Sequence, residues 1–161
     1  MANVDKNQAV IDYLLVCPAI KNSPLYFNFT EAQDENKQIV TQGNDIYLNK
    51  EYLNGDVLKR YTFTIIDYKS VSYDAIIKMT GYVNENVEEI LDCQGIIDWI
   101  EEQNDAMNYP NFGDTCEIQE IKALTINPNI NGTQISGSLA LAKYSVAIQI
   151  EYLDTSKRIW N

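Results

Sequence analysis

The chain has 161 residues, 45% of them hydrophobic, and its 23 acidic residues outnumber 12 basic ones to give a formal net charge of −11. This length and apolar content indicate one globular domain and exclude a disordered chain. The acidic balance argues against a protein that grips nucleic acid or binds an anionic membrane surface. It indicates either a surface that keeps the protein soluble or one that must not adhere to DNA passing nearby.

The N-terminus and the cysteines together indicate a reduced, intracellular protein. The sequence shows no charged-then-apolar leader and no apolar run of about 18 residues, so we expect synthesis in the cytoplasm without membrane insertion. Cys17, Cys93 and Cys116 are widely spaced and include no C-x-x-C pair. This pattern predicts buried thiols and not a disulfide framework.

The first predicted element is a helix over residues 5–16. Asp5 and Gln8 have the spacing of a capping box, in which the aspartate accepts from a backbone N–H and the glutamine reaches back. Pro18 prevents the helix from continuing. Apolar residues at helical spacing predict that one face covers a sheet, and these are Val10, Ile11, Leu14 and Leu15.

A region of strands follows the first helix. A polar, acidic loop at 31–37 separates the first two extended segments, and a polar, tyrosine-containing connection covers 67–73. Strand-forming residues bounded by turn residues predict four extended segments, at 25–29, 39–41, 46–53 and 57–68.

The dipeptide Asn54-Gly55 is the strongest hairpin signal in the chain, because both positions of a two-residue turn need positive φ. In the strand that follows it, Tyr61 and Phe63 alternate with polar residues. This alternation predicts that both aromatic side chains point into the core.

The second helix carries the residue that we expect to matter most to the core. Asn84 or Asn86 caps it, and Gly95 interrupts it, marking either a kink or the meeting of two helical pieces. Trp99 shares one face with two isoleucines, and we expect it to pin the helix to the sheet. Tyr109-Pro110 is expected to end the helix, because a residue before proline leaves the α region. The predicted core positions of this helix are Ile96, Trp99 and Ile100.

The last third of the chain is predicted as strand, loop, strand and tail. The alternation of the strand at 116–126 slips near Glu120, which indicates a bulge. Residues 127–138 are rich in Asn, Gly, Pro and Ser and are expected to form a long, mobile loop. The final strand, at 142–153, alternates most clearly and places Tyr144 and Ile148 inward, and we expect an extended tail at 155–161 after it.

Together these elements predict a single α+β domain over residues 1–161, with two main helices packed on one face of an antiparallel sheet and long loops between elements.

The residue types in the sequence give little support for catalysis. The chain has no histidine, which removes the usual nucleophile pairs, His-based acid–base catalysis and common zinc sites. The pairs Glu88-Glu89 and Glu101-Glu102 are expected to be solvated, because adjacent helical residues do not face each other; a glycosidase pair or a loose Ca²⁺ site is the alternative. We expect no catalytic, cofactor or metal site.

Two stretches resemble small minor capsid or tail-terminator (tail-completion) proteins of tailed phages and prophages of Gram-positive bacteria. The first is 42–73, with a Gly-Asp hairpin start, a tyrosine near the turn and a basic residue followed by Tyr-x-Phe. The second is 99–104, followed by Pro110 and Gly113.

The N-terminal stretch 13–18 and the stretch 142–144 of the final strand are similar to the same family. The likeness therefore covers most of the chain, although no motif in it is catalytic or unique. The chain departs from the family pattern at 74–95, at the loop 127–138 and at the extended tail Ile159-Trp160.

The resemblance implies a structural virion protein, assembled in the host cytoplasm and located in the tail or neck. Such proteins form a ring, usually hexameric, that stops growth of the tail tube and joins it to the neck or connector. The implied partners are further copies of the chain, the tail tube protein, the neck protein and, in a contractile tail, the sheath. DNA would pass through the lumen without specific binding, and an acidic lining would repel its phosphates.

Two other functions stay open: a head-side neck adaptor or minor capsid protein, and a small cytosolic enzyme. For the ring, we expect contacts from the acidic loop 31–36, the loop 127–138 and the C-terminal tail, where aromatic and arginine side chains commonly anchor interfaces. The candidate interface residues are Asp34, Glu35, Asn129, Asn131, Arg158, Ile159 and Trp160.

Overall fold

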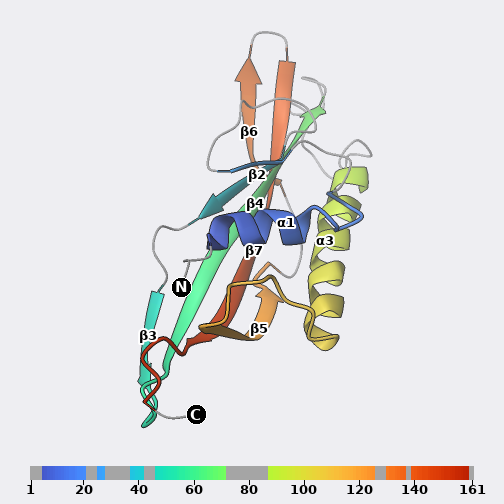
Figure 1. The fold of residues 1–161 in the computed structure, drawn as a ribbon. Coiled ribbons are helices and arrows are strands. Elements are labelled where there is room, and N and C mark those ends of the chain that lie inside the picture. The colour runs from blue at the N-terminus through green and yellow to red at the C-terminus, as the bar shows by residue number, and fades with distance from the viewer. Residues whose placement is uncertain are drawn as a thin grey trace.

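A computed structural model describes residues 5–20, 25–27, 37–41, 46–71, 87–125, 130–136 and 139–159. The fold is α+β, as the sequence predicts (Figure 1). Its described elements, in chain order, are α1 (Lys6–Leu14), β1 (Leu25–Phe27), β2 (Lys37–Thr41), β3 (Ile46–Glu51), β4 (Val57–Val71), α3 (Val87–Asp105), β5 (Cys116–Ala123), β6 (Ile130–Ser136) and β7 (Leu139–Asp154).

The described strands form one sheet around the long antiparallel pair β4–β7. This pair runs from Val57 opposite Asp154 to Val71 opposite Ala140. Strands β2 and β3 both pair with β4, and β5 and β6 both pair with β7. The sheet is antiparallel except that β1 and β2 are parallel. Nine residues, 28–36, separate the two strands in the sequence, so they are not the arms of a two-residue hairpin, which would make them antiparallel.

One face of the β4–β7 pair is the core face. Tyr61 lies opposite Ile150 and Phe63 opposite Ile148, and all four side chains are buried, whereas their chain neighbours on β4 are only half-buried. This is the two-residue alternation that the sequence predicts. The seven side chains predicted for the core are all buried: Ile96, Trp99, Ile100, Tyr61, Phe63, Tyr144 and Ile148.

Both helices pack on this core face. Asn7 of α1 accepts a hydrogen bond from the Tyr61 hydroxyl, and the Lys6 ammonium lies 5.0 Å from the centroid of the Tyr152 ring. Figure 1 accordingly shows α1 lying across β4 and β7, with α3 beside it. The two helices meet where the rings of Tyr13 and Trp99 approach to 4.9 Å between centroids.

The ends of the helices differ from the sequence prediction. Helix α1 ends at Leu14 and not at residue 16, and Asp5 caps it as expected by accepting from the amides of Asn7 and Gln8. The reciprocal half of the capping box is not made. The Gln8 side chain instead donates to Asp12 one turn further along the helix, at 2.8 Å.

Helix α3 runs unbroken through Gly95, so the predicted meeting of two helical pieces there is wrong. It ends at Asp105, before the predicted stop at Tyr109-Pro110. Met107 adopts a left-handed conformation with φ 54°, and the amide of Asn108 donates back to the Gln103 carbonyl at 2.9 Å. This cap ends the helix locally, so the proline is not needed to end it.

Part of the predicted long loop 127–138 is a strand. Residues 130–136 form β6 and pair antiparallel with the start of β7. The register shifts between Ile130 and Gly132, so Asn131 lies in an irregular step of the ladder. The polar and glycine residues of this segment have the local pattern of a loop, but they form a strand because they pair with the long strand β7. Strand β7 itself begins at Leu139, earlier than predicted. The bulge predicted near Glu120 is confirmed by a register shift between Ile118 and Glu120.

Strand β4 continues to Val71, so the predicted polar connection from 67 is in part a strand. Of the stretches predicted to depart from the family pattern, residues 87–95 belong to α3, whereas 74–86 lie outside the described residues.

Candidate functional site

Backbone and side-chain hydrogen bonds hold the turn between β3 and β4. The last strand pair is Glu51 with Val57, and the amide of Gly55 donates to the carbonyl of Tyr52 at 2.9 Å. Gly55 has φ +94°, but Asn54 is not among the positive-φ residues. The predicted two-residue turn with both φ positive is therefore wrong. The amide of Tyr52 donates to the carbonyl of Asp56 at 2.9 Å and so closes a loop of three residues, 53–55, which ends in a glycine bulge.

Asn54 has a different role from the one predicted. Its side-chain oxygen accepts from the amide of Asp56 at 3.0 Å, and its side-chain nitrogen donates to the Asp56 carboxylate at 3.2 Å. Asparagine is favoured here because its side chain bonds the backbone two residues on. It also helps to hold Asp56 in place.

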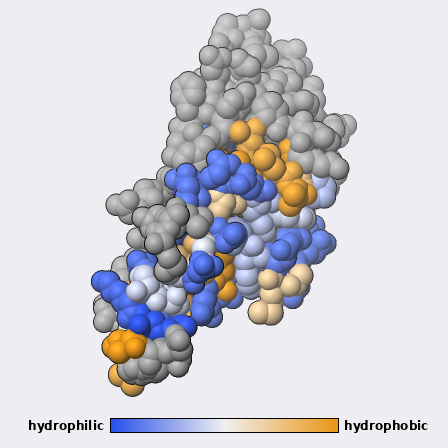
Figure 2. All heavy atoms as spheres, viewed as in Figure 1, coloured by the Kyte–Doolittle hydropathy of each residue, from blue (hydrophilic) through white to orange (hydrophobic). Residues whose placement is uncertain are grey.

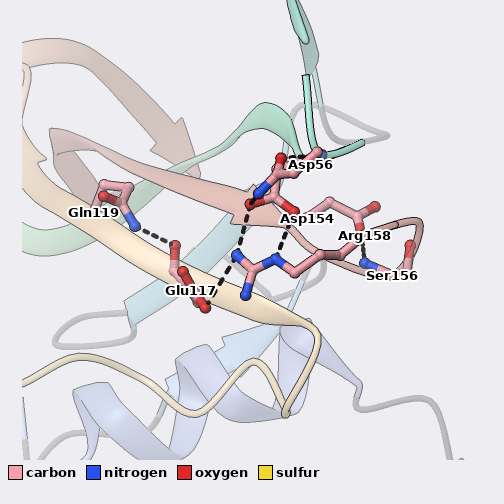
Figure 3. A network of polar contacts seen from close by, with 7 residues as sticks. Asp56, Glu117, Gln119, Asp154, Ser156 and Arg158 are labelled. Atoms are coloured by element: carbon pink, nitrogen blue, oxygen red, sulfur yellow. Dashed lines mark hydrogen bonds and ion pairs between the residues drawn. The ribbon is translucent and has the colours of Figure 1, made fainter. Parts of the chain in front are cut away.

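Asp56 binds the C-terminal segment. The residue is 3% exposed, and its carboxylate accepts two hydrogen bonds from Arg158, one from Nε at 3.0 Å and one from Nη2 at 2.6 Å (Figure 3). This two-point geometry is the strongest form of a carboxylate–guanidinium pair. The amide of Ile159 then donates to the carbonyl of Asn54 at 2.7 Å. The backbone of the predicted extended tail is therefore fixed to the turn as far as Ile159.

Further charges surround this clamp, by which we mean the Asp56–Arg158 pair. Glu117 of β5 lies 3.5 Å from Arg158 Nη2, and Lys59 donates to Asp154 at 2.7 Å (Figure 3 shows Glu117 and Asp154 beside Arg158). Hydrogen bonds from Arg158 lower the pKa of Asp56, and the bonds to Asp56 raise the pKa of Arg158. Each partner of the clamp therefore favours the charged form of the other.

Three large apolar side chains are exposed around the clamp, and we call them the apolar tip: Tyr52, Leu53 and Ile159. Leu53 is 94% exposed, Ile159 72% and Tyr52 41%. Figure 1 places the hairpin and the C-terminal segment together at the lower end of the molecule, and Figure 2 shows hydrophobic atoms gathered there. The Asp56–Arg158 ion pair thus holds together two segments whose apolar side chains are exposed to solvent. Such a cluster of exposed apolar side chains marks a candidate binding surface.

A second candidate surface is a hollow between α1 and the segment after α3, which we call the α1 hollow. Its volume is about 460 Å³. Tyr13 at its edge donates a hydrogen bond from its hydroxyl to the carbonyl of Asn108 at 2.9 Å, and burial raises the pKa of Tyr13 well above its ordinary value. The lining residues are Asp5, Gln8, Ala9, Asp12, Tyr13, Tyr109, Pro110 and Asn111.

The predicted interface residues do not share one environment in the structure. Arg158 is engaged within its own chain, whereas the Ile159 side chain is exposed as expected. Asn131 lies in the irregular step of β6. Asp34, Glu35, Asn129 and Trp160 lie outside the described residues.

Sequence reasoning missed Leu53 and Asp56. A signal for Leu53 was present, because an aliphatic side chain directly before Asn-Gly stands where turns usually carry polar residues. Asp56 carried no such signal, since its partner lies 102 residues away.

The described part of the chain carries no group of three or more His, Cys, Asp or Glu side chains arranged to hold a metal ion. None of the three cysteines forms a disulfide, and Cys17 and Cys93 are buried. Within the described residues, no helix is both long and apolar enough to span a membrane.

No protein-family model matches the chain, and no curated protein matches its sequence.

The ion pairs beside the tip predict a loss of stability in acid. Burial raises the pKa of Asp154, but hydrogen bonds from Lys59 and Ser156 lower it more, to about 2 from an ordinary 3.8. A carboxylate with a lowered pKa stabilises the fold above its unfolded pKa and loses that contribution as pH falls through the folded one. We expect the melting temperature to fall between about pH 4 and pH 2. Asp154→Asn should be less stable than wild type at pH 5 and show a smaller fall; equal slopes would contradict the prediction.

Proposed function

We propose that this protein is a structural component of a phage virion, a tail terminator whose ring stops tube growth and joins the tail to the neck. The observation that carries the proposal is the apolar tip. Leu53 and Ile159 are exposed to solvent although the chain is strongly acidic, and the clamp fixes the two segments that carry them. Exposed apolar side chains held in place reduce the ordering cost of association, which is what a subunit that must assemble requires.

Two further features support assembly through repeated contacts. The sheet has outer strands on both sides, β3 beside β4 and β5 beside β7. Strand edges and the tip are different surfaces from the α1 hollow, so contacts between unlike patches can close into a ring. A closed ring supplies an end point that a tube of identical subunits lacks.

The charge of the chain and its resemblance to tail terminators agree with this role. A net charge of −11 disfavours adhesion of DNA phosphates, as a ring around a DNA passage requires. The resemblance rests on the stretches 42–73 and 99–104; the first contains the β3–β4 hairpin, and the second lies near the end of α3. The sheath would be a further partner in a contractile tail.

The test is deletion of the gene in the parent phage, followed by electron microscopy of the particles. We expect abnormally long tubes of variable length and heads without joined tails, with both defects reversed by the wild-type gene. Tubes of normal, uniform length joined to heads would contradict the proposal. Uniform tubes that stay separate from heads would favour a head-side neck adaptor or minor capsid protein instead.

A further inference from the structure

We propose that the apolar tip of one copy inserts into the α1 hollow of the next copy. This inference rests on the proposed ring and names the two surfaces that form its repeated contact. The tip is a projection and the hollow a recess, and each copy carries one of each. The partner at the tip is therefore a second copy of this chain.

The lining of the hollow suits an aliphatic guest. Ala9, Pro110 and the rings of Tyr13 and Tyr109 supply apolar surface, and the volume of about 460 Å³ falls in the range of clefts that accept small ligands. Leu53 and Ile159 are the most exposed aliphatic side chains at the tip. Burial of such side chains against rings is a favourable driving force for association.

Charge complementarity selects the hollow as the recipient. The hollow is lined by Asp5 and Asp12. At the tip, Asp56 and Asp154 are paired with cations of their own chain, while Lys157 is exposed and forms no ion pair with another described residue. Lys157 of one copy would thus face carboxylates of the next. Contact between two tips would instead place one Lys157 against another, which is repulsive.

The clamp explains why the contact can form at low cost. Leu53 and Ile159 come from segments far apart in the sequence, and the Asp56–Arg158 pair holds those segments together before any partner arrives. Side chains ordered in advance lose less entropy on binding. Because tip and hollow are unlike surfaces, the contact is head-to-tail, and it closes into a ring or continues as a filament.

Cysteine cross-linking tests the contact directly, in a Cys116→Ser background because Cys17 and Cys93 are buried. Chains carrying Leu53→Cys are mixed with chains carrying Asn111→Cys, oxidised, and analysed by non-reducing electrophoresis and mass spectrometry. We expect a disulfide between the two kinds of chain. Met107→Cys is the matched control, since Met107 is 75% exposed but lies outside the tip, and it should not cross-link to Asn111→Cys.

Assembly is measured in parallel by analytical ultracentrifugation. Leu53→Asp should weaken association at least tenfold while leaving thermal unfolding of the monomer unchanged, and Met107→Asp should leave association unchanged. Rings that form without the cross-link and tolerate Leu53→Asp would overturn the inference but leave the proposed function standing. Open chains that do cross-link would support the contact and contradict the ring. A monomer at all concentrations without cross-links would overturn both.

Discussion

Trp99→Ala is expected to destabilise the protein by about 3–5 kcal/mol, the usual cost of removing a large aromatic side chain from a core. Trp99 is only 9% exposed, and its ring lies 4.9 Å from that of Tyr13 between centroids. The substitution leaves a cavity at the point where α1 meets α3. Both helices should then lose part of their contact with the core face of the sheet.

The measurement is urea unfolding followed by circular dichroism, which gives the free energy of unfolding. Trp99→Phe keeps a ring against Tyr13 and should cost distinctly less. Glu101→Ala is the matched control on the same helix, because Glu101 is exposed and should change stability by less than about 0.5 kcal/mol. A loss below about 1 kcal/mol for Trp99→Ala would show that the helix interface collapses around the cavity at little cost.

Gly55→Ala is expected to destabilise the protein by about 2–4 kcal/mol, from backbone strain and overpacking together. Gly55 has φ +94°, which side-chain-bearing residues rarely adopt. A Cβ atom there would lie 2.3 Å from the carbonyl oxygen of Lys157, so the turn and the tail could not both stay in place. Displacement of the tail would separate Arg158 from Asp56.

Amide hydrogen exchange shows whether Gly55→Ala displaces the tail from the turn. The amide of Ile159 donates to the Asn54 carbonyl at 2.7 Å, and we expect its exchange to accelerate in Gly55→Ala. Gly55→Asn separates the two causes, since asparagine tolerates positive φ but still carries a Cβ. If the contact with the tail dominates, asparagine should be nearly as harmful as alanine. A stable Gly55→Asn with slow Ile159 exchange would show that only backbone strain matters.

The tail beyond Asp154 has two roles. Truncation after Asp154 would remove Ile159, but it would also remove Arg158 and leave the nearly buried Asp56 carboxylate without its cation. Such a truncation would therefore alter the fold of the hairpin as well as any contact between copies. Substitution of exposed Leu53 is the cleaner probe of assembly.

Local pattern in the sequence was sufficient to determine the elements that have strong periodicity. The alternation around Tyr61 and Phe63 places them on the core face, and the helical spacing of Ile96, Trp99 and Ile100 predicts their burial. These features depend on neighbours within a few residues, so the sequence encodes them directly. The same reasoning predicted the α+β class and the bulge in β5.

Tertiary structure alone decided the features that depend on distant partners. Residues 130–136 read as loop until β7 supplies a neighbour to pair with, and α3 stays continuous through Gly95 in the packed fold. The Asp56–Arg158 clamp joins residues 102 positions apart, and nothing in the sequence near either one identifies the other. The apolar tip follows from that pairing, because two short exposed segments become one surface only when the fold brings them together and an ion pair holds them.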